Sequence, residues 1–208
     1  MTNQSITNIF SNKQFLSNNI LITGATSGIG LATANLLDYL NAKLILVGRD
    51  KNKLEDLNKT FNSRHLIINQ DLSKEDSIYD LIKELPESYL PLTGIFHSAG
   101  TALVKSLRIT KAKDLNNLIS STAGVALSIG RAATNKKLFA SNASIVLMSS
   151  VSSICGTTGM SAYSSSKGAI DSLVKSMSIE LAPRGIRVNS IIAGAVETPL
   201  HKNLLDTL

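Results

Sequence analysis

The chain has 208 residues, of which 43% are hydrophobic, and this length suits one compact domain with a buried core. Its Lys and Arg residues are scattered and only 4% of residues are aromatic, which argues against nucleic-acid binding, whereas the net charge of +6 favours anionic small molecules such as phosphorylated cofactors. A single cysteine, Cys155, excludes an internal disulfide and a multi-cysteine metal site, and no apolar run is long enough to span a membrane.

The first 18 residues form a polar, Asn/Ser-rich extension. They lack the basic start and apolar middle of a secretory signal, so we expect a cytoplasmic protein. One domain then covers residues 19–208, because no repeat, low-complexity tract or Pro/Gly-rich linker divides it.

Short aliphatic runs alternate with longer segments of helical period along this domain. Such alternation is typical of parallel strands joined by crossover helices. The predicted strands cover residues 19–23, 43–47, 65–69, 94–98, 144–149 and 186–192. The predicted helices cover residues 28–40, 50–59, 111–138 and 162–182, with a further helix that begins at Ser73, where Asp76 three residues later suggests a capping box. Right-handed crossovers would wind about six strands into one doubly wound α/β sheet.

A glycine-rich turn, T-G-A-T-S-G-I-G at residues 23–30, joins the first strand to the first helix. Its glycines allow a close approach of backbone to ligand, and the N–H groups that start a helix attract a pyrophosphate. The alternative is a turn without a ligand. Its position between a strand and an amphipathic helix favours dinucleotide binding by Gly24, Thr26, Ser27, Gly28, Ile29 and Gly30.

The second strand ends in V-G-R-D, residues 47–50, where the adenosine ribose of a dinucleotide would lie. An acidic side chain there suits a ribose hydroxyl, whereas an arginine suits a 2′-phosphate. Arg49 therefore favours NADP(H), while Asp50 and a merely solvated Arg49 keep NAD(H) possible. After the third strand, Asp71 and Leu72 are candidates for contacting the adenine, although Asp71 also suits a turn.

Tyr163 and Lys167 lie four residues apart on the inward face of the last predicted helix. An ammonium beside a phenol, joined by an oxidised nicotinamide, stabilises the phenolate and lowers its pKa from about 10. Ser150 ends the fifth strand, where its hydroxyl is placed to hold a carbonyl oxygen. The alternatives are an exposed helix pair and a serine that only satisfies loop backbone. Convergence with the glycine turn on one sheet edge favours the catalytic interpretation.

Several motifs, in this order, resemble the short-chain dehydrogenase/reductase family from about Asn19 to Leu200. They are T-G-x-x-x-G-I-G at residues 23–30, H-S-A-G at 97–100 in place of the usual N-N-A-G, a serine thirteen residues before the tyrosine at Ser150, Y-x-x-x-K at 163–167, and R-V-N-S-I-I-A-G at 187–194 in place of an ending P-G.

This resemblance implies a Rossmann fold and an NADP(H)-dependent oxidoreductase that reduces a carbonyl or oxidises an alcohol. Tyr163 would be the acid/base, Lys167 would lower its pKa and hold the nicotinamide ribose, and Ser150 would orient the carbonyl. Thr198 would contact the carboxamide, and the other implied cofactor contacts are Ala99, Gly100, Gly194 and Val196. The partner would be a small-molecule carbonyl or alcohol, with 3-oxoacyl groups as the default, and the protein a homodimer or homotetramer.

Two features depart from the family pattern. An asparagine in the long helix, written N-x-x-G, normally takes part in a proton relay, but S-T-A-G at residues 121–124 puts Ser121 in its place. Helical period makes Thr122 a rival for this position. The family's last helix and strand would also be missing. These departures motivate an alternative function, a non-catalytic or weakly active NADP(H)-binding member with a sensing or assembly role.

Overall fold

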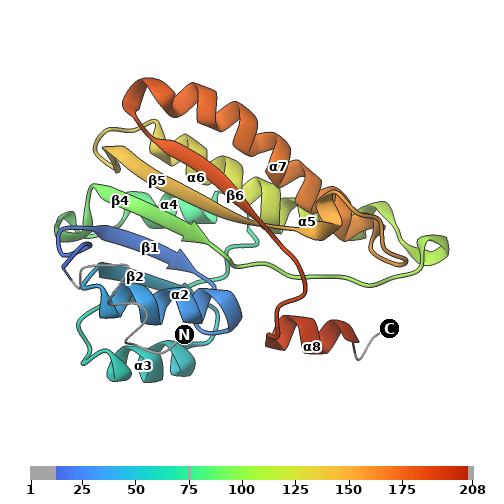
Figure 1. Ribbon diagram of the computed structural model, residues 1–208, viewed down its shortest axis with the longest axis horizontal. Helices are drawn as coiled ribbons and strands as arrows, with labels where there is room; N and C mark the ends of the chain where they lie inside the picture. The colour runs from blue at the N-terminus through green and yellow to red at the C-terminus, as the bar shows by residue number, and fades with distance from the viewer. Residues whose placement is uncertain (1–12, 75, 206–208) are drawn as a thin grey trace.

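The computed structural model describes residues 13–74 and 76–205, so most of the predicted N-terminal extension lies outside the described residues. The described chain forms an α/β fold with one parallel six-stranded sheet, in the order β3-β2-β1-β4-β5-β6 (Figure 1). This confirms the predicted doubly wound sheet. The strands are β1 (Asn19–Thr23), β2 (Lys43–Gly48), β3 (Leu66–Asn69), β4 (Leu92–His97), β5 (Phe139–Ser150) and β6 (Arg187–Ala193).

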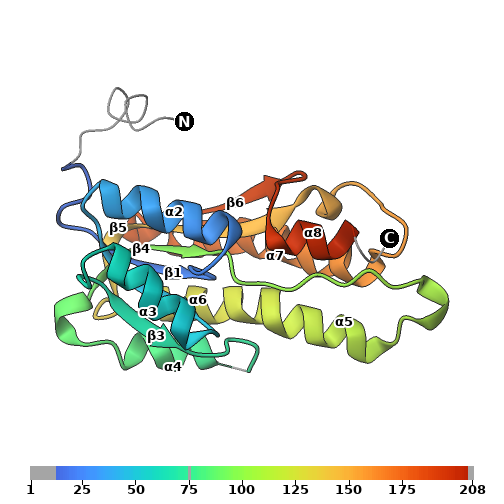
Figure 2. The ribbon, with the colours of Figure 1, turned by 90° about the horizontal axis from the view of Figure 1, so that it is seen from below.

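Helices cover both faces of the sheet, as Figure 2 shows. One apolar core joins the sheet to α4 (Ser77–Lys83), α6 (Val125–Ala133) and α7 (Ser161–Leu181). A second core joins the opposite face to α2 (Gly28–Tyr39) and α3 (Lys51–Thr60). The remaining helices are α5 (Ala112–Ile119), α8 (Pro199–Leu205) and the short turns η1 (Glu87–Tyr89), η2 (Leu107–Ile109), η4 (Val151–Ser153) and η5 (Ala182–Arg184). Within the described ranges, no helix is long and apolar enough to cross a bilayer.

The strand sequences explain why the sheet is parallel and central. Residues 44–47 of β2 are fully buried, which is the pattern of a strand covered by helices on both faces. Every pairing in the sheet is parallel, and α8 lies beyond the carboxyl ends of β1, β4, β5 and β6 in Figure 1. Pairing in register places Thr23 of β1 beside His97 of β4, and Ser150 of β5 beside Ala193 of β6. The motifs that follow different strands therefore meet at one edge.

The predicted single helix over residues 111–138 is interrupted in the structure. A π-helical turn, η3 (Ser120–Gly124), separates α5 from α6, and α6 ends at Ala133. The hydroxyls of Ser121 and Thr122 donate to the carbonyls of Asn117 and Leu118, at 2.8 and 2.6 Å. Such side-chain bonds to the preceding turn compete with regular helix geometry, and π-turns occur mostly as single turns within helices.

The helix predicted to begin at Ser73 begins instead at Ser77. The Asp71 carboxylate accepts the Ser73 N–H at 3.0 Å and makes a turn there. Asp76, expected inside the helix, has a left-handed φ of 54° and is the residue before the helix. Its carboxylate accepts hydrogen bonds from Ser128 and Arg131 of α6, both at 3.0 Å, so a tertiary contact overrides the local capping pattern.

Candidate active site

A cavity of about 560 Å³ opens at the carboxyl edge of the sheet. The segments that follow all six strands contribute to its lining. It brings together every residue singled out from the sequence as a site candidate: Gly24, Thr26, Ser27, Gly28, Ile29, Gly30, Arg49, Asp71, Leu72, Ala99, Gly100, Ser121, Ser150, Tyr163, Lys167, Gly194, Val196 and Thr198.

The glycine turn has the shape required for a diphosphate. Gly24 has a φ of +68°, and a Cβ there would lie 2.9 Å from the backbone nitrogen of Ala99. A Cβ on Gly30 would collide with the carbonyl oxygen of Gly24. Since no larger residue fits at either place, the turn packs closely against its neighbours, and the first residues of α2, Gly28, Ile29 and Gly30, line the cavity. Free N–H groups at the start of a helix suit a pyrophosphate. The residues present thus fit a dinucleotide.

The two charged residues at the end of β2 make different contacts in the structure. Asp50 is the residue before α3, and its Oδ1 accepts the Lys53 N–H at 3.1 Å. Its carboxylate is therefore engaged in capping a helix. Arg49 is exposed and lines the cavity, as does Lys53. Hydrogen bonds from Ser73 hold the pKa of Asp71 below its usual range. Of its two predicted roles, Asp71 therefore has the contact that forms a turn.

Tyr163 and Lys167 face inward from the first turns of α7, and each is only 7% exposed. The Lys167 Nζ donates to the Met148 carbonyl at 2.8 Å and lies 5.7 Å from the centroid of the Tyr163 ring. Ser150 ends β5, and its Oγ accepts the Ser152 N–H at 3.2 Å. A phenol, an ammonium and a hydroxyl therefore line the same cavity as the glycine turn.

The pKa of Tyr163 differs from the sequence-based expectation. Burial raises it above the usual value, and hydrogen bonding with Ser150 only opposes this rise. Burial also lowers the pKa of Lys167 to about 8, against the attraction of Asp171. The sequence predicted that the pKa of Tyr163 would be lowered, but the protein groups around it raise this pKa instead. The physical reason is that desolvation disfavours the phenolate while the ammonium is directed at the Met148 carbonyl.

His97 belongs to the H-S-A-G motif, but the motif by itself indicated no role for it. It is 3% exposed, and its Nδ1 lies 2.7 Å from the Thr23 Oγ1. Thr23 Oγ1 also accepts the Ala99 N–H at 3.1 Å, so one hydroxyl links the ends of β1 and β4 to the segment that follows β4. Burial, together with the nearby Lys167 charge, lowers the pKa of His97 to about 3. His97 thus joins β1 to β4 as a neutral ring.

The structure also distinguishes the two rivals in S-T-A-G. Thr122 is 1% exposed, whereas Ser121 lines the cavity. The Ser121 hydroxyl nevertheless donates to the carbonyl of Asn117 in α5, the helix that precedes η3. The relay role that the resemblance implied for this position therefore stays a prediction.

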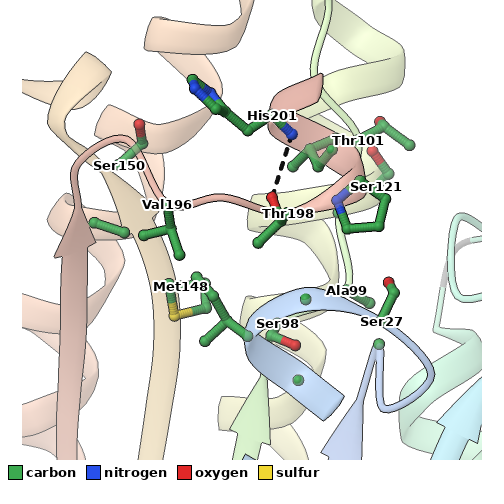
Figure 3. Close-up of a pocket in the computed structure, with 18 of the residues that line it drawn as sticks. Ser27, Ser98, Ala99, Thr101, Ser121, Met148, Ser150, Val196, Thr198 and His201 are labelled. Carbon is green, nitrogen blue, oxygen red and sulfur yellow. Dashed lines mark hydrogen bonds between the residues drawn. The ribbon is translucent and has the colours of Figure 1, made fainter. Parts of the chain in front are cut away.

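Helix α8 adds cavity residues that the sequence did not single out. Thr198 accepts the N–H of His201 through its Oγ1 at 3.2 Å, the contact drawn in Figure 3, and Pro199 occupies the first helical position. Thr-Pro is a common start signal for a helix and would have revealed α8. Pro199, Leu200 and His201 line the cavity.

A family model described as short chain dehydrogenase matches residues 18–208. The chain belongs to this family. It is 31% identical over 198 residues to a glucose 1-dehydrogenase of Gluconobacter oxydans, covering 93% of this chain and 74% of that protein. It is 32% identical over 193 residues to an NADP-dependent (R)-specific alcohol dehydrogenase of Lentilactobacillus kefiri, covering 88% and 75%.

Solved structures agree with this assignment. A short-chain dehydrogenase/reductase of Brucella melitensis superposes with a TM-score of 0.83 at 28% identity, covering 93% of this chain and 79% of that chain. This short-chain dehydrogenase is therefore an oxidoreductase with the family's Rossmann sheet, as the sequence predicted.

Replacing His97 with the asparagine usual in this family is expected to make the short-chain dehydrogenase less sensitive to acid. The unfolded histidine takes up a proton near pH 6.5 but the folded one only near pH 3, so wild-type stability falls as pH drops below 6.5. This amounts to roughly 2 kcal/mol at pH 5. Urea unfolding at pH 7.5 and 5.0 measures the loss in both proteins. An equal loss in His97→Asn would contradict the assignment, and the pH 7.5 value controls for altered packing.

Proposed function

We propose that this protein is an NADP(H)-dependent oxidoreductase that reduces a carbonyl, or oxidises the corresponding alcohol, with Tyr163 as the acid/base. One observation carries the proposal: Ser150, Tyr163 and Lys167 line a single cavity together with the glycine turn. Tyr163 and Lys167 are also almost completely buried, which is unusual for polar side chains without a task.

Ser150, Tyr163 and Lys167 would each have a distinct role in the reaction. A bound nicotinamide supplies or accepts the hydride. The Ser150 hydroxyl holds the carbonyl oxygen, and the Tyr163 hydroxyl donates a proton to that oxygen during reduction. The Lys167 ammonium, whose pKa is about 8, is charged at neutral pH and stabilises the phenolate that Tyr163 becomes.

The preference for NADP(H) over NAD(H) is supported by the charges after β2. The Asp50 carboxylate caps α3 through Oδ1 and pairs with the Lys53 ammonium through Oδ2 at 3.8 Å, while Arg49 brings a guanidinium to the same end of the cavity. A guanidinium suits the 2′-phosphate of NADP(H) because it donates several hydrogen bonds in one plane. The relative from Lentilactobacillus kefiri is named as NADP-dependent.

Removing the guanidinium tests this preference. Arg49→Ala is expected to weaken NADPH binding by about tenfold or more and to leave NADH binding within about twofold, since only NADPH carries the phosphate. Calorimetric titration with each cofactor measures both constants. Lys51→Ala is the control, because Lys51 is an exposed lysine two residues further along, at the start of α3, that pairs with Glu55 at 3.7 Å and does not line the cavity. Equal losses for NADPH and NADH would contradict the proposal.

The proposed activity is tested by the loss of NADPH absorbance with a panel of ketones and aldehydes. We expect turnover of at least one neutral carbonyl and slower turnover with NADH. NADPH binding without turnover of any substrate would instead support the non-catalytic alternative and overturn the proposal.

We also propose a homodimer or homotetramer. Leu127 of α6 is 57% exposed and Ile179 of α7 is 76% exposed, so both helices present aliphatic side chains to a second copy. Sedimentation equilibrium distinguishes these assemblies from a monomer, and a monomer at micromolar concentration would contradict the proposal.

A further inference from the structure

Charged side chains occupy only one part of the cavity. Among its lining residues, Arg49, Asp50, Lys53 and Asp71 all follow β2 or β3. The lining from the segments after β4, β5 and β6 contains no Asp, Glu or Arg among the described residues. Its basic residues are Lys167 of α7, whose ammonium donates to the Met148 carbonyl, and His201 of α8. We call the part around Ser150 and Tyr163 the uncharged part of the cavity, because the described residues place no carboxylate or guanidinium there.

The two parts are separated by the width of the sheet. The order β3-β2-β1-β4-β5-β6 puts three strand spacings between the end of β2, with Arg49, and the end of β5, with Ser150. At about 4.8 Å per spacing, this is roughly 14 Å. A carbonyl held at Ser150 would therefore be far from Arg49 and Lys53, and a bound dinucleotide would lie between them. Lys167 already donates to the Met148 carbonyl.

Exposed apolar side chains line the uncharged part. Val151, Val196 and Leu200 are 40%, 42% and 43% exposed, and all three line the cavity. Figure 3 shows Val196 beside Met148, on the segment that leads from β6 to Thr198 and α8. Val104 and Met160 complete this lining from the Tyr163 side, where both pack in one cluster with the Tyr163 ring. An apolar ligand that covers this surface removes it from water, and this favours binding.

We propose that the substrate is an uncharged carbonyl or alcohol whose substituent is apolar. This inference rests on the proposed function and names the substrate class of the same site. A carboxylate or phosphate on the substituent would lose its hydration against Val151, Val196 and Leu200. The basic side chains near it are Lys167, which already donates to the Met148 carbonyl, and the imidazole of His201. A polyhydroxylated substrate would likewise exchange water for this aliphatic surface, and the hydroxyl of Ser121 is already bonded to the Asn117 carbonyl.

A matched pair of ketones tests the inference. 2-Octanone and 7-oxooctanoate share a methyl ketone on a chain of eight carbons and differ by a terminal carboxylate. We expect kcat/KM with NADPH to be at least about tenfold higher for 2-octanone, and its Kd for the enzyme–NADPH complex, measured by calorimetry, to be lower by a similar factor. Equal values for the two ketones, or a higher kcat/KM with NADP+ for glucose than for 2-octanol, would overturn the inference.

The calorimetric measurement separates this inference from the proposed function. Tighter binding of 2-octanone than of 7-oxooctanoate, without turnover of either, would support the apolar site and overturn the proposed proton transfer. Turnover of both ketones at equal kcat/KM would support the proton transfer and overturn the apolar site.

A charge placed in the uncharged part provides a second test. Leu200→Lys is expected to reduce the preference for 2-octanone over 7-oxooctanoate by about fivefold or more, because the ammonium pairs with the carboxylate. Leu16→Lys is the matched control, since Leu16 is an aliphatic residue that is 61% exposed and does not line the cavity. We expect it to retain the wild-type preference. An unchanged preference in Leu200→Lys would overturn the placement of the substituent beside α8.

Discussion

Tyr163→Phe is expected to lower kcat/KM for carbonyl reduction by roughly 10³-fold, the usual contribution of a positioned general acid. The substitution removes only the hydroxyl oxygen. The ring remains 7% exposed in its cluster with Leu118, Met160 and Ala162, so the fold and the cavity are retained. NADPH affinity is expected to stay within about threefold, because under the proposed function the glycine turn and Arg49, which line the opposite end of the cavity, would hold most of the cofactor. Steady-state kinetics and calorimetric titration measure the two quantities.

Tyr89→Phe is the matched control for this substitution. Tyr89 lies in η1, its ring stacks under the Lys43 ammonium at 4.0 Å, and it does not line the cavity. We expect wild-type kinetics from it. A Tyr163→Phe enzyme with an unchanged rate would exclude Tyr163 as the acid and, with it, the proposed mechanism.

Lys167→Met is expected to lower the turnover rate while it stabilises the fold. Activity falls because no ammonium remains to stabilise the phenolate, at a cost of about 10²-fold or more in kcat. Stability rises because burial lowers the pKa of Lys167 to about 8 from its usual 10.5, which shows that the fold disfavours the charged form. After the loss of the hydrogen bond to Met148 is subtracted, the expected gain is on the order of 2 kcal/mol at pH 7.

The pH dependence of this gain identifies its cause. Between pH 10.5 and pH 8 the unfolded lysine takes up a proton and the folded one does not, so the wild-type protein loses stability as pH falls through this window. The advantage of Lys167→Met should therefore be full at pH 7 and shrink as pH rises toward 10. Urea unfolding at pH 7, 8.5 and 10 measures it. Lys175→Met, at an exposed position of the same helix, is the control. A Lys167→Met protein less stable than wild type at pH 7 would show that the hydrogen bond outweighs desolvation.

Much of the fold and of the candidate site could be predicted from the sequence because both depend on local patterns. Apolar runs and helical periods define the strands and α7, and the parallel topology then brings every strand end to one edge. For this reason Arg49, Ser150 and Tyr163, which are far apart in the chain, could be assigned to one cavity before their distances were known. Even α8 left a local signal in Thr198 and Pro199 that the sequence analysis overlooked.

The tertiary structure alone decided the contacts that depend on register and burial. His97 meets Thr23, 74 residues away, because β1 and β4 pair in one register, and a histidine pKa of about 3 follows from burial beside Lys167. The same holds for the Lys167 ammonium, whose partner is the Met148 carbonyl rather than the phenol. The sequence by itself determined which elements form and which chemical groups stand at their ends. Desolvation and hydrogen-bond partners are properties of the packed neighbours, so only the folded chain decides how those groups are charged and where they point.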